Sequence, residues 1–356
     1  MVLTSLFVTW AIRDWSTTSA YMPEGRESDF RLTDLYALVG NASTERHLDT
    51  EVVVVGLDNL SRDEIADALE LIGAADPRAV GLDVIFSHPE ANDSRLVEVL
   101  RELGTKLVAP TTSTISSYPV YDSIPGLVTG SVELPVATNR ATVRDYYAKG
   151  SFPARLAETF TGSQTRQGSG ADVVPIYWGA TEFRTLDPSE LEDNLDLLEG
   201  KAVIAGMLGD YPDMHPTPVD DNMPGTLIHA HALSNILSGN HLTVPPKWVE
   251  YLVGIVMGWS VIFFYLWASR TPLGNFMMRT LQILLLALIV ASGMWMYFRY
   301  NICFDFAWPL MLVGVSIIAG DVWSVVPVTA RWLASRSVFI KTKQLLKNKL
   351  HKTQTP

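Results

Sequence analysis

The sequence contains a single cysteine, Cys303, so no disulfide bond can form within the chain. That scarcity is compatible with a bacterial envelope protein. Residues 1–247 are also poor in basic side chains, with 17 Lys and Arg against 35 Asp and Glu. This acidic balance argues against a nucleic-acid partner. The sequence has no nucleophile elbow, phosphate-binding loop or metalloprotease motif, so we do not expect an enzyme.

Acidic side chains are scarce in the rest of the chain, where residues 248–356 hold three of them against ten Lys and Arg. Long apolar runs occupy residues 248–268, 276–298 and about 302–328. Each run is long enough to cross a bilayer core of about 30 Å, which needs about 20 apolar residues per helix. Aromatic residues gather at the ends of the runs, as they do at membrane interfaces. The sequence therefore predicts three transmembrane helices within residues 248–330.

The basic residues predict how these helices are oriented. Seven Lys and Arg, and no acid, follow the third run in residues 331–356, so this tail should be cytoplasmic. Arg270 and Arg279 place the first connection on the same side. Three alternating spans then put residues 13–247 outside the cytoplasm, which for a bacterium means a multi-pass inner-membrane protein with a periplasmic domain. Residues 1–12 are apolar but short, and we expect them to be a partial N-terminal span.

In residues 13–247, strand-like and helical sequence patterns alternate as they do in an α/β domain. Valine-rich and other apolar runs at 52–58, 79–86, 106–110 and 201–208 are typical of buried strands. Helical patterns separate them, and one begins at Ser61 with Glu64 at capping-box spacing. This alternation predicts a mostly parallel sheet with helices on both faces, extracytoplasmic and followed by the three-helix transmembrane region. Residues 126–134 suggest a further strand, and residues 187–200 an acidic, capped surface segment.

Several polar residues should meet at one edge of this sheet. Asp58 ends the first strand, Asp83 lies within the second, and the loop after residues 201–208 carries Asp213 and His215. Ligands of open α/β sheets bind beyond the carboxyl ends of the strands. Carboxylates with one histidine suit a polar ligand or a divalent metal ion. The alternative is structural, with backbone amides or an arginine satisfying Asp83 and the loop acids capping turns.

The stretch "MPGTLIHAHALSNILSGN" (residues 223–240) contains an H-x-H pair. Two histidines at this spacing chelate a metal from a strand but point about 200° apart on a helix. The apolar spacing and the Gly239 stop signal favour an amphipathic helix. Chelation by the pair is therefore not expected. His229 falls on the apolar face and remains a binding candidate, while His231 should face water.

The chain resembles the type-two CHASE domain, a sensory extracellular domain of bacteria associated with cyclases and histidine kinases. The resemblance lies in "VVVVGLDNLS" (52–61), "GLDVIFSHP" (81–89), and the elements "DMHPTP" and "MPGTLIHA" that follow "KAVIAGML" (201–208). The lead-in "FRLTDLYALVG" (30–40) and the order of domain and spans fit as well. The family commonly has a Trp/Pro-rich segment after its first strand, which "LDNLSRDEI" lacks. Its spans usually lead to an output domain, whereas here a basic tail follows them.

Small residues within the predicted spans allow close helix contacts. Gly254 and Gly258 form a GxxxG pair in the first span, and Ser316 and Gly320 repeat the spacing in the third. Such pairs serve either association between chains or ordinary packing within one chain. Asp321 is an intramembrane acid and hence a functional candidate. The alternative is that Asp321 reaches the nearby interface.

These features lead to one functional expectation and two alternatives. We expect a receptor-like membrane subunit whose outer domain binds a small ligand or envelope protein and passes its state to a separate partner. The partner would be another membrane or envelope protein, and a homo-oligomer is also compatible. The first alternative is a structural subunit of an envelope complex without sensing. The second is a metal-dependent enzyme.

Overall fold

The computed structural model describes residues 31–43, 45–136, 141–163, 172–209, 213–268 and 274–318. The chain divides into two compact units. The α/β unit comprises Thr18–Pro245 and Gly293–Phe304. The helical unit comprises Met1–Thr17, Pro246–Ser292 and Asp305–Pro356.

The α/β unit is built on a six-stranded sheet with the order β4-β3-β2-β8-β1-β7. All neighbouring strands run parallel. The predicted mostly parallel sheet is therefore confirmed. Its strands are β1 (His47–Gly56), β2 (Ala79–Asp83), β3 (Leu107–Thr111), β4 (Val128–Ser131), β7 (Thr181–Leu186) and β8 (Ala202–Gly206).

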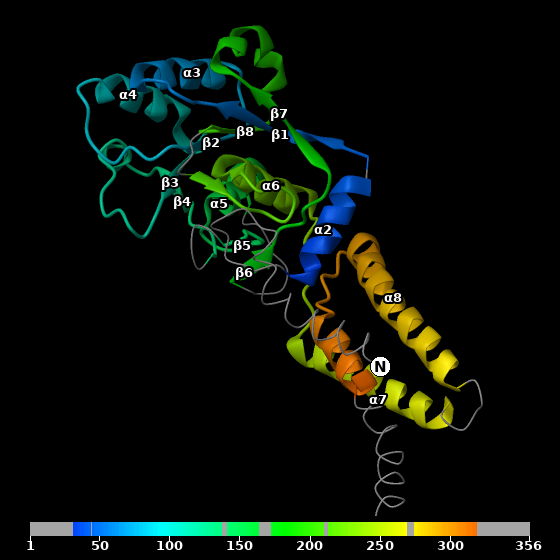
Figure 1. Ribbon diagram of the computed structural model, residues 1–356. Helices are drawn as coiled ribbons and strands as arrows, with labels where there is room; N and C mark the ends of the chain where they lie inside the picture. Colours follow the sequence, from blue (N-terminus) through cyan, green and yellow to red (C-terminus); the bar gives the residue numbers. More distant parts are fainter. Residues whose placement is uncertain are drawn as a thin grey trace, which may run out of the picture. The chain divides into compact units, whose positions relative to one another are not determined.

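Helices cover both faces of this sheet, as Figure 1 shows. On one face, α3 (Arg62–Ala74) and α4 (Asp93–Leu103) bury a core that includes Val53, Val55 and Leu82. On the other face, α5 (Phe152–Thr161) and α6 (Gly225–Ser238) bury Val52, Val54 and Ile204. Alternate residues of β1 therefore point into two different cores. This is why β1 reads as an unbroken run of valine rather than an alternating pattern.

Local interactions fix where the elements begin and how closely they pack. Ser61 caps α3 in the predicted capping box, and its backbone N–H donates to Glu64 Oε2 at 2.7 Å. A side chain at Gly130 would meet the backbone of Phe152 at 2.6 Å, so only glycine lets the start of α5 approach β4 this closely. Asn92, in contrast, makes no side-chain cap at the start of α4.

Several elements of the structure were not predicted from the sequence. They include the edge strand β7, the helix α5 and the helix α2 (Leu32–Ser43). The region between β4 and β8 also holds the antiparallel pair β5 (Asp145–Tyr147) and β6 (Val173–Pro175). A second small pair joins β9 (Met214–His215) to β10 (Met223–Pro224). The segment predicted at residues 187–200 consists of short 3₁₀ turns, the first with an Asp187–Glu190 capping box.

The helical unit contains α7 (Lys247–Ala268). The next helix, α8 (Gly274–Tyr300), begins in the helical unit, and its residues from Gly293 onward belong to the α/β unit. Helices Lys247–Ala268 and Phe276–Tyr300 are long and apolar enough to cross a membrane. Large apolar side chains such as Trp259, Phe263 and Phe276 lie exposed on them. Of the third predicted span, the structure describes a helix at Ala307–Ile318. The expected N-terminal span, Gly320, Asp321 and the basic tail lie outside the described residues.

The predicted small residues of the first span lie against that third helix. A Cβ on Gly254 would meet Leu312 at 2.8 Å and the Pro309 backbone at 3.3 Å. A Cβ on Gly258 would meet Ser316 Oγ at 3.1 Å. These contacts are packing within one chain, which was one of the two alternatives for the GxxxG pair.

Candidate functional site

The carboxyl ends of β2, β8 and β1 form the edge where the sequence placed its polar cluster. β8 lies between β2 and β1, and the helix that follows it, α6, covers the opposite face from α3 and α4. Strands whose following helices leave on opposite faces mark a topological switch point, where α/β folds bind ligands. Asp83 and Gly206 stand in register at this edge, and Gly56 pairs with Gly206 from the other side. We call this region the carboxyl-edge site.

Asp58 closes one flank of the carboxyl-edge site. Its carboxylate accepts the backbone N–H of Leu208 at 3.0 Å and of Gly209 at 2.7 Å. Both donors belong to the loop after β8, so Asp58 ties the end of β1 to that loop. The Asp58 carboxylate is therefore held in place by two backbone amides.

Asp83 is the last residue of β2 rather than an interior one, and it lies on the other flank. Its Oδ2 accepts a 2.8 Å hydrogen bond from the hydroxyl of Thr226, in the first turn of α6. Burial is the main cause that raises the pKa of the Asp83 carboxyl, and the charge of Asp213 raises it further. The charge of His229 and the hydrogen bond from Thr226 both act to lower this pKa. The charges of Asp213 and His229 thus both act on the Asp83 carboxyl.

Asp213 and His215 approach the same helix from the loop after β8. His215 Nε2 lies 3.3 Å from Asp213 Oδ1. The Asp213 carboxylate fills the space where a side chain on Gly225 would be, at the first residue of α6. A carboxylate there is favourable because the helix N-terminus carries partial positive charge. The carboxyl-edge site therefore brings Asp83, Asp213, His215 and His229 together around the start of α6, with Asp58 on the far flank.

Both histidines of the H-x-H pair lie on a helix, as predicted, and chelation by the pair is not available to them. His229 is 4% exposed and packs on the ring of Phe152 at 5.5 Å. The expectation that His231 faces water is wrong, because its exposed fraction is only 8%. Its ring lies 5.2 Å from Trp178 and 4.8 Å from Phe183. Burial lowers the pKa of His231 to about 4, with Asp49 opposing the shift.

A metal site does not assemble from these groups. Among the residues that the structure describes, no three His, Cys, Asp or Glu side chains are grouped so that they could hold one metal ion. The buried ring atoms His215 Nδ1 and His229 Nδ1 have no hydrogen-bond partner.

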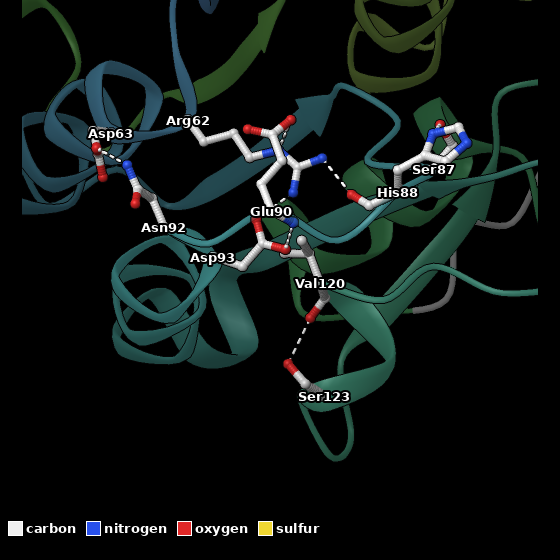
Figure 2. Close-up of polar contacts among 9 residues, drawn as sticks. All are labelled: Arg62, Asp63, Ser87, His88, Glu90, Asn92, Asp93, Val120 and Ser123. Carbon is white, nitrogen blue, oxygen red and sulfur yellow. Dashed lines mark hydrogen bonds and ion pairs between the residues drawn. The ribbon is translucent and has the colours of Figure 1, made fainter.

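Arg62 organises the loop beside the carboxyl-edge site, and the sequence analysis missed it (Figure 2). From the first residue of α3, it pairs with Asp93 and with Glu90 at 3.2 Å, and it donates to the carbonyl of His88. Its guanidinium lies 5.1 Å from the ring centre of Phe86. These contacts hold residues 84–93 against the start of α3. The motif "NLSRDE" gave a signal only for the cap at Ser61, because the partners of Arg62 lie about 30 residues away.

A cavity of about 390 Å³ opens next to this loop, at the end of β3 and the start of β4. Its aromatic wall includes Tyr121, whose hydroxyl donates to the carbonyl of Val84 at 2.5 Å, one residue after Asp83. Burial raises the pKa of Tyr121 well above its usual value, and the charge of Asp83 adds to the rise. Tyr121 thus connects the cavity to the carboxyl-edge site. The lining residues are Pro110, Thr111, Ser116, Tyr118, Tyr121, Asp122, Ile124, Gly126, Leu127 and Thr129.

Comparison with known protein families gives a match that covers most of the chain. The family model of the CHASE2 domain matches residues 30–265. The chain belongs to the CHASE2 domain family. No curated protein and no solved structure matches it in the same comparisons.

The CHASE2 match spans more than the α/β unit. It begins two residues before α2 and ends within the last turn of α7. It therefore includes the carboxyl-edge site, the cavity and most of the first membrane-spanning candidate. CHASE2 domains are sensory extracellular domains, and this membership agrees with a sensory role for the chain.

Proposed function

We propose that this chain is a receptor-like subunit of a bacterial inner membrane. Its CHASE2 domain lies in the periplasm, binds a small ligand and passes its state to a separate partner protein in or at the membrane. The observation that carries the proposal is the family match, which joins a sensory domain to a membrane-spanning candidate in one continuous region. The seven Lys and Arg in residues 331–356 support the orientation with this tail in the cytoplasm.

The cavity at β3 and β4 offers the ligand a place in the CHASE2 domain. The lining has the carboxylate of Asp122 and no basic side chain. Asp122 already accepts the N–H of Tyr118 at 2.7 Å and the hydroxyl of Ser117 at 3.0 Å, which holds the carboxylate in place. Threonine and serine hydroxyls complete the polar lining. This surface suits an uncharged or cationic molecule that donates hydrogen bonds, and it disfavours an anion.

One purification tests the proposal. We expect the full-length protein, isolated in mild detergent and denatured, to release a small molecule detectable by mass spectrometry. The variant Leu127→Trp fills the cavity and should lose that molecule, because an indole ring occupies space that the ligand needs. Leu48→Trp, at an exposed position of β1, is the matched control and should retain it.

The same samples distinguish the structural alternative. Protein mass spectrometry of the purified material will show which chains stay bound. A fixed set of stoichiometric protein partners, with no small molecule released from wild type, would contradict the receptor role and favour a scaffold in an envelope complex. Release of a divalent metal would instead favour the enzyme alternative.

A further inference from the structure

The start of α6 is locked to the carboxyl-edge site. Thr226, in its first turn, donates to Asp83 at 2.8 Å. The strand β8 has glycine at position 206, and a Cβ there would collide with the Thr226 hydroxyl and approach Asp83 Cβ to 3.0 Å. The position of α6 along its axis is therefore defined by the contacts at the end of β2 and β8.

The far half of α6 contacts a different part of the CHASE2 domain. Its Asn235 donates to the backbone carbonyl of Tyr177 at 3.3 Å. One turn earlier, the buried ring of His231 packs against Trp178 at 5.2 Å. Residues 177–178 are thus held by the last turns of the helix whose first turn holds Asp83. At about 1.5 Å per residue, the nine-residue step from Thr226 to Asn235 separates these two contacts by about 14 Å along α6.

Residues 177–178 in turn hold the end of α8. The ring of Tyr177 stacks on Tyr297 of α8 with centres 5.5 Å apart and planes at 26°. The residues of α8 from Gly293 onward belong to the α/β unit. The ring of Tyr297 also packs against Tyr36 of α2, with centres 6.0 Å apart.

The chain just after α8 is also part of the α/β unit. Thr243 and Ile302 form a parallel bridge. The N–H of Cys303 donates to the Thr243 carbonyl at 3.0 Å, and the N–H of Thr243 donates to the Asn301 carbonyl at 2.7 Å. The outer end of α8 and its following segment are therefore fastened to the CHASE2 domain by ring stacking and by backbone hydrogen bonds.

We propose that α6 is a rigid relay that couples the carboxyl-edge site, through Asn235, Tyr177 and Tyr297, to the end of α8. The helix is buried on nearly all sides, so a shift at Thr226 moves its far end rather than bending it. α8 is one continuous helix from Gly274 to Tyr300, which makes it the route by which the state of the CHASE2 domain leaves the domain. The relay deepens the proposed sensory function by assigning the element that transmits it.

Hydrogen exchange on the full-length protein in detergent tests the relay without any ligand. Thr226→Val removes the donor to Asp83 and preserves the shape of the side chain. We expect amides in residues 293–304 to exchange at least about 5-fold faster in this variant, the lower end of typical coupling between sites. Thr226→Ser keeps a hydroxyl and should restore wild-type exchange, which excludes a simple folding defect. The matched control is Thr185→Val, at an exposed position of β7.

A second variant tests the contact at the far end of α6. Asn235→Leu should raise exchange in residues 293–304 and add little to the effect of Thr226→Val, because both act through one helix. Unchanged exchange in residues 293–304, with faster exchange near Asp83 alone, would overturn the relay. Since no ligand is used, failure of the relay and failure of ligand binding are read from separate experiments.

Discussion

Replacing Arg144 by Met is expected to lower the free energy of unfolding of the α/β unit by about 3–5 kcal/mol. Arg144 forms a two-pronged ion pair with Asp34 of α2, with Nε to Oδ1 and Nη2 to Oδ2 both at 2.7 Å. The two side chains are 9% and 7% exposed. Removing the arginine leaves a buried carboxylate without its cation, and that uncompensated charge is the main cost. Urea unfolding of the full-length protein in detergent, followed by circular dichroism, measures the change.

Two further variants serve as controls for the Arg144→Met result. Arg95→Met removes an exposed arginine that pairs with Asp67, and it should leave the free energy of unfolding nearly unchanged, because water screens exposed ion pairs. The double variant Asp34→Leu with Arg144→Met leaves no buried charge from the pair and should recover much of the loss. A loss for Arg144→Met no larger than for Arg95→Met would show that the ion pair does not anchor α2.

The second large effect is a loss of stability at acidic pH that depends on His231. Its pKa is about 4 in the folded protein because of burial, against an ordinary value of 6.5. Below pH 6.5 the unfolded chain binds a proton at this site that the folded chain does not. Stability should therefore fall as the pH drops from about 6.5 to about 4, by about 3 kcal/mol for a shift of this size.

Comparison with His231→Phe isolates this contribution. Phenylalanine does not titrate, and it keeps an aromatic ring against Trp178 and Phe183. We expect the difference in unfolding free energy between wild type and variant to change by about 3 kcal/mol between pH 7 and pH 4. Asp83 works in the opposite direction, because its raised pKa favours proton binding by the folded state, but it is present in both proteins. Parallel pH curves for the two proteins would contradict the burial of His231.

The central part of the fold was predictable because its signals are local. The valine run of β1 and the apolar runs of β2, β3 and β8 are buried on both faces, and such strands show up as continuous apolar segments. The edge strand β7 was missed because only one side of it is paired and its sequence, TEFRTL, is mostly polar. Its partner in the sheet, β1, lies more than 100 residues earlier in the chain.

The candidate site was predictable only in outline. The positions of Asp58 and Asp83 at strand ends follow from the parallel sheet. Their actual partners, the Leu208 amide and the Thr226 hydroxyl, lie more than 140 residues away and depend on how the loop after β8 folds. The prediction that His231 faces water was wrong for a related reason. A helical projection assumes one buried face, whereas residues 178–183 cover the second face of α6.

Labelling of single cysteines in spheroplasts tests most directly whether the CHASE2 domain is presented outside the cytoplasm. With Cys303 replaced by Ser, one variant carries Thr185→Cys on exposed β7 and another carries Lys347→Cys in the basic tail. The account predicts that a membrane-impermeant maleimide labels the first variant in intact spheroplasts and the second only after lysis. Labelling of the Lys347→Cys variant in intact spheroplasts, with the Thr185→Cys variant protected until lysis, would contradict it.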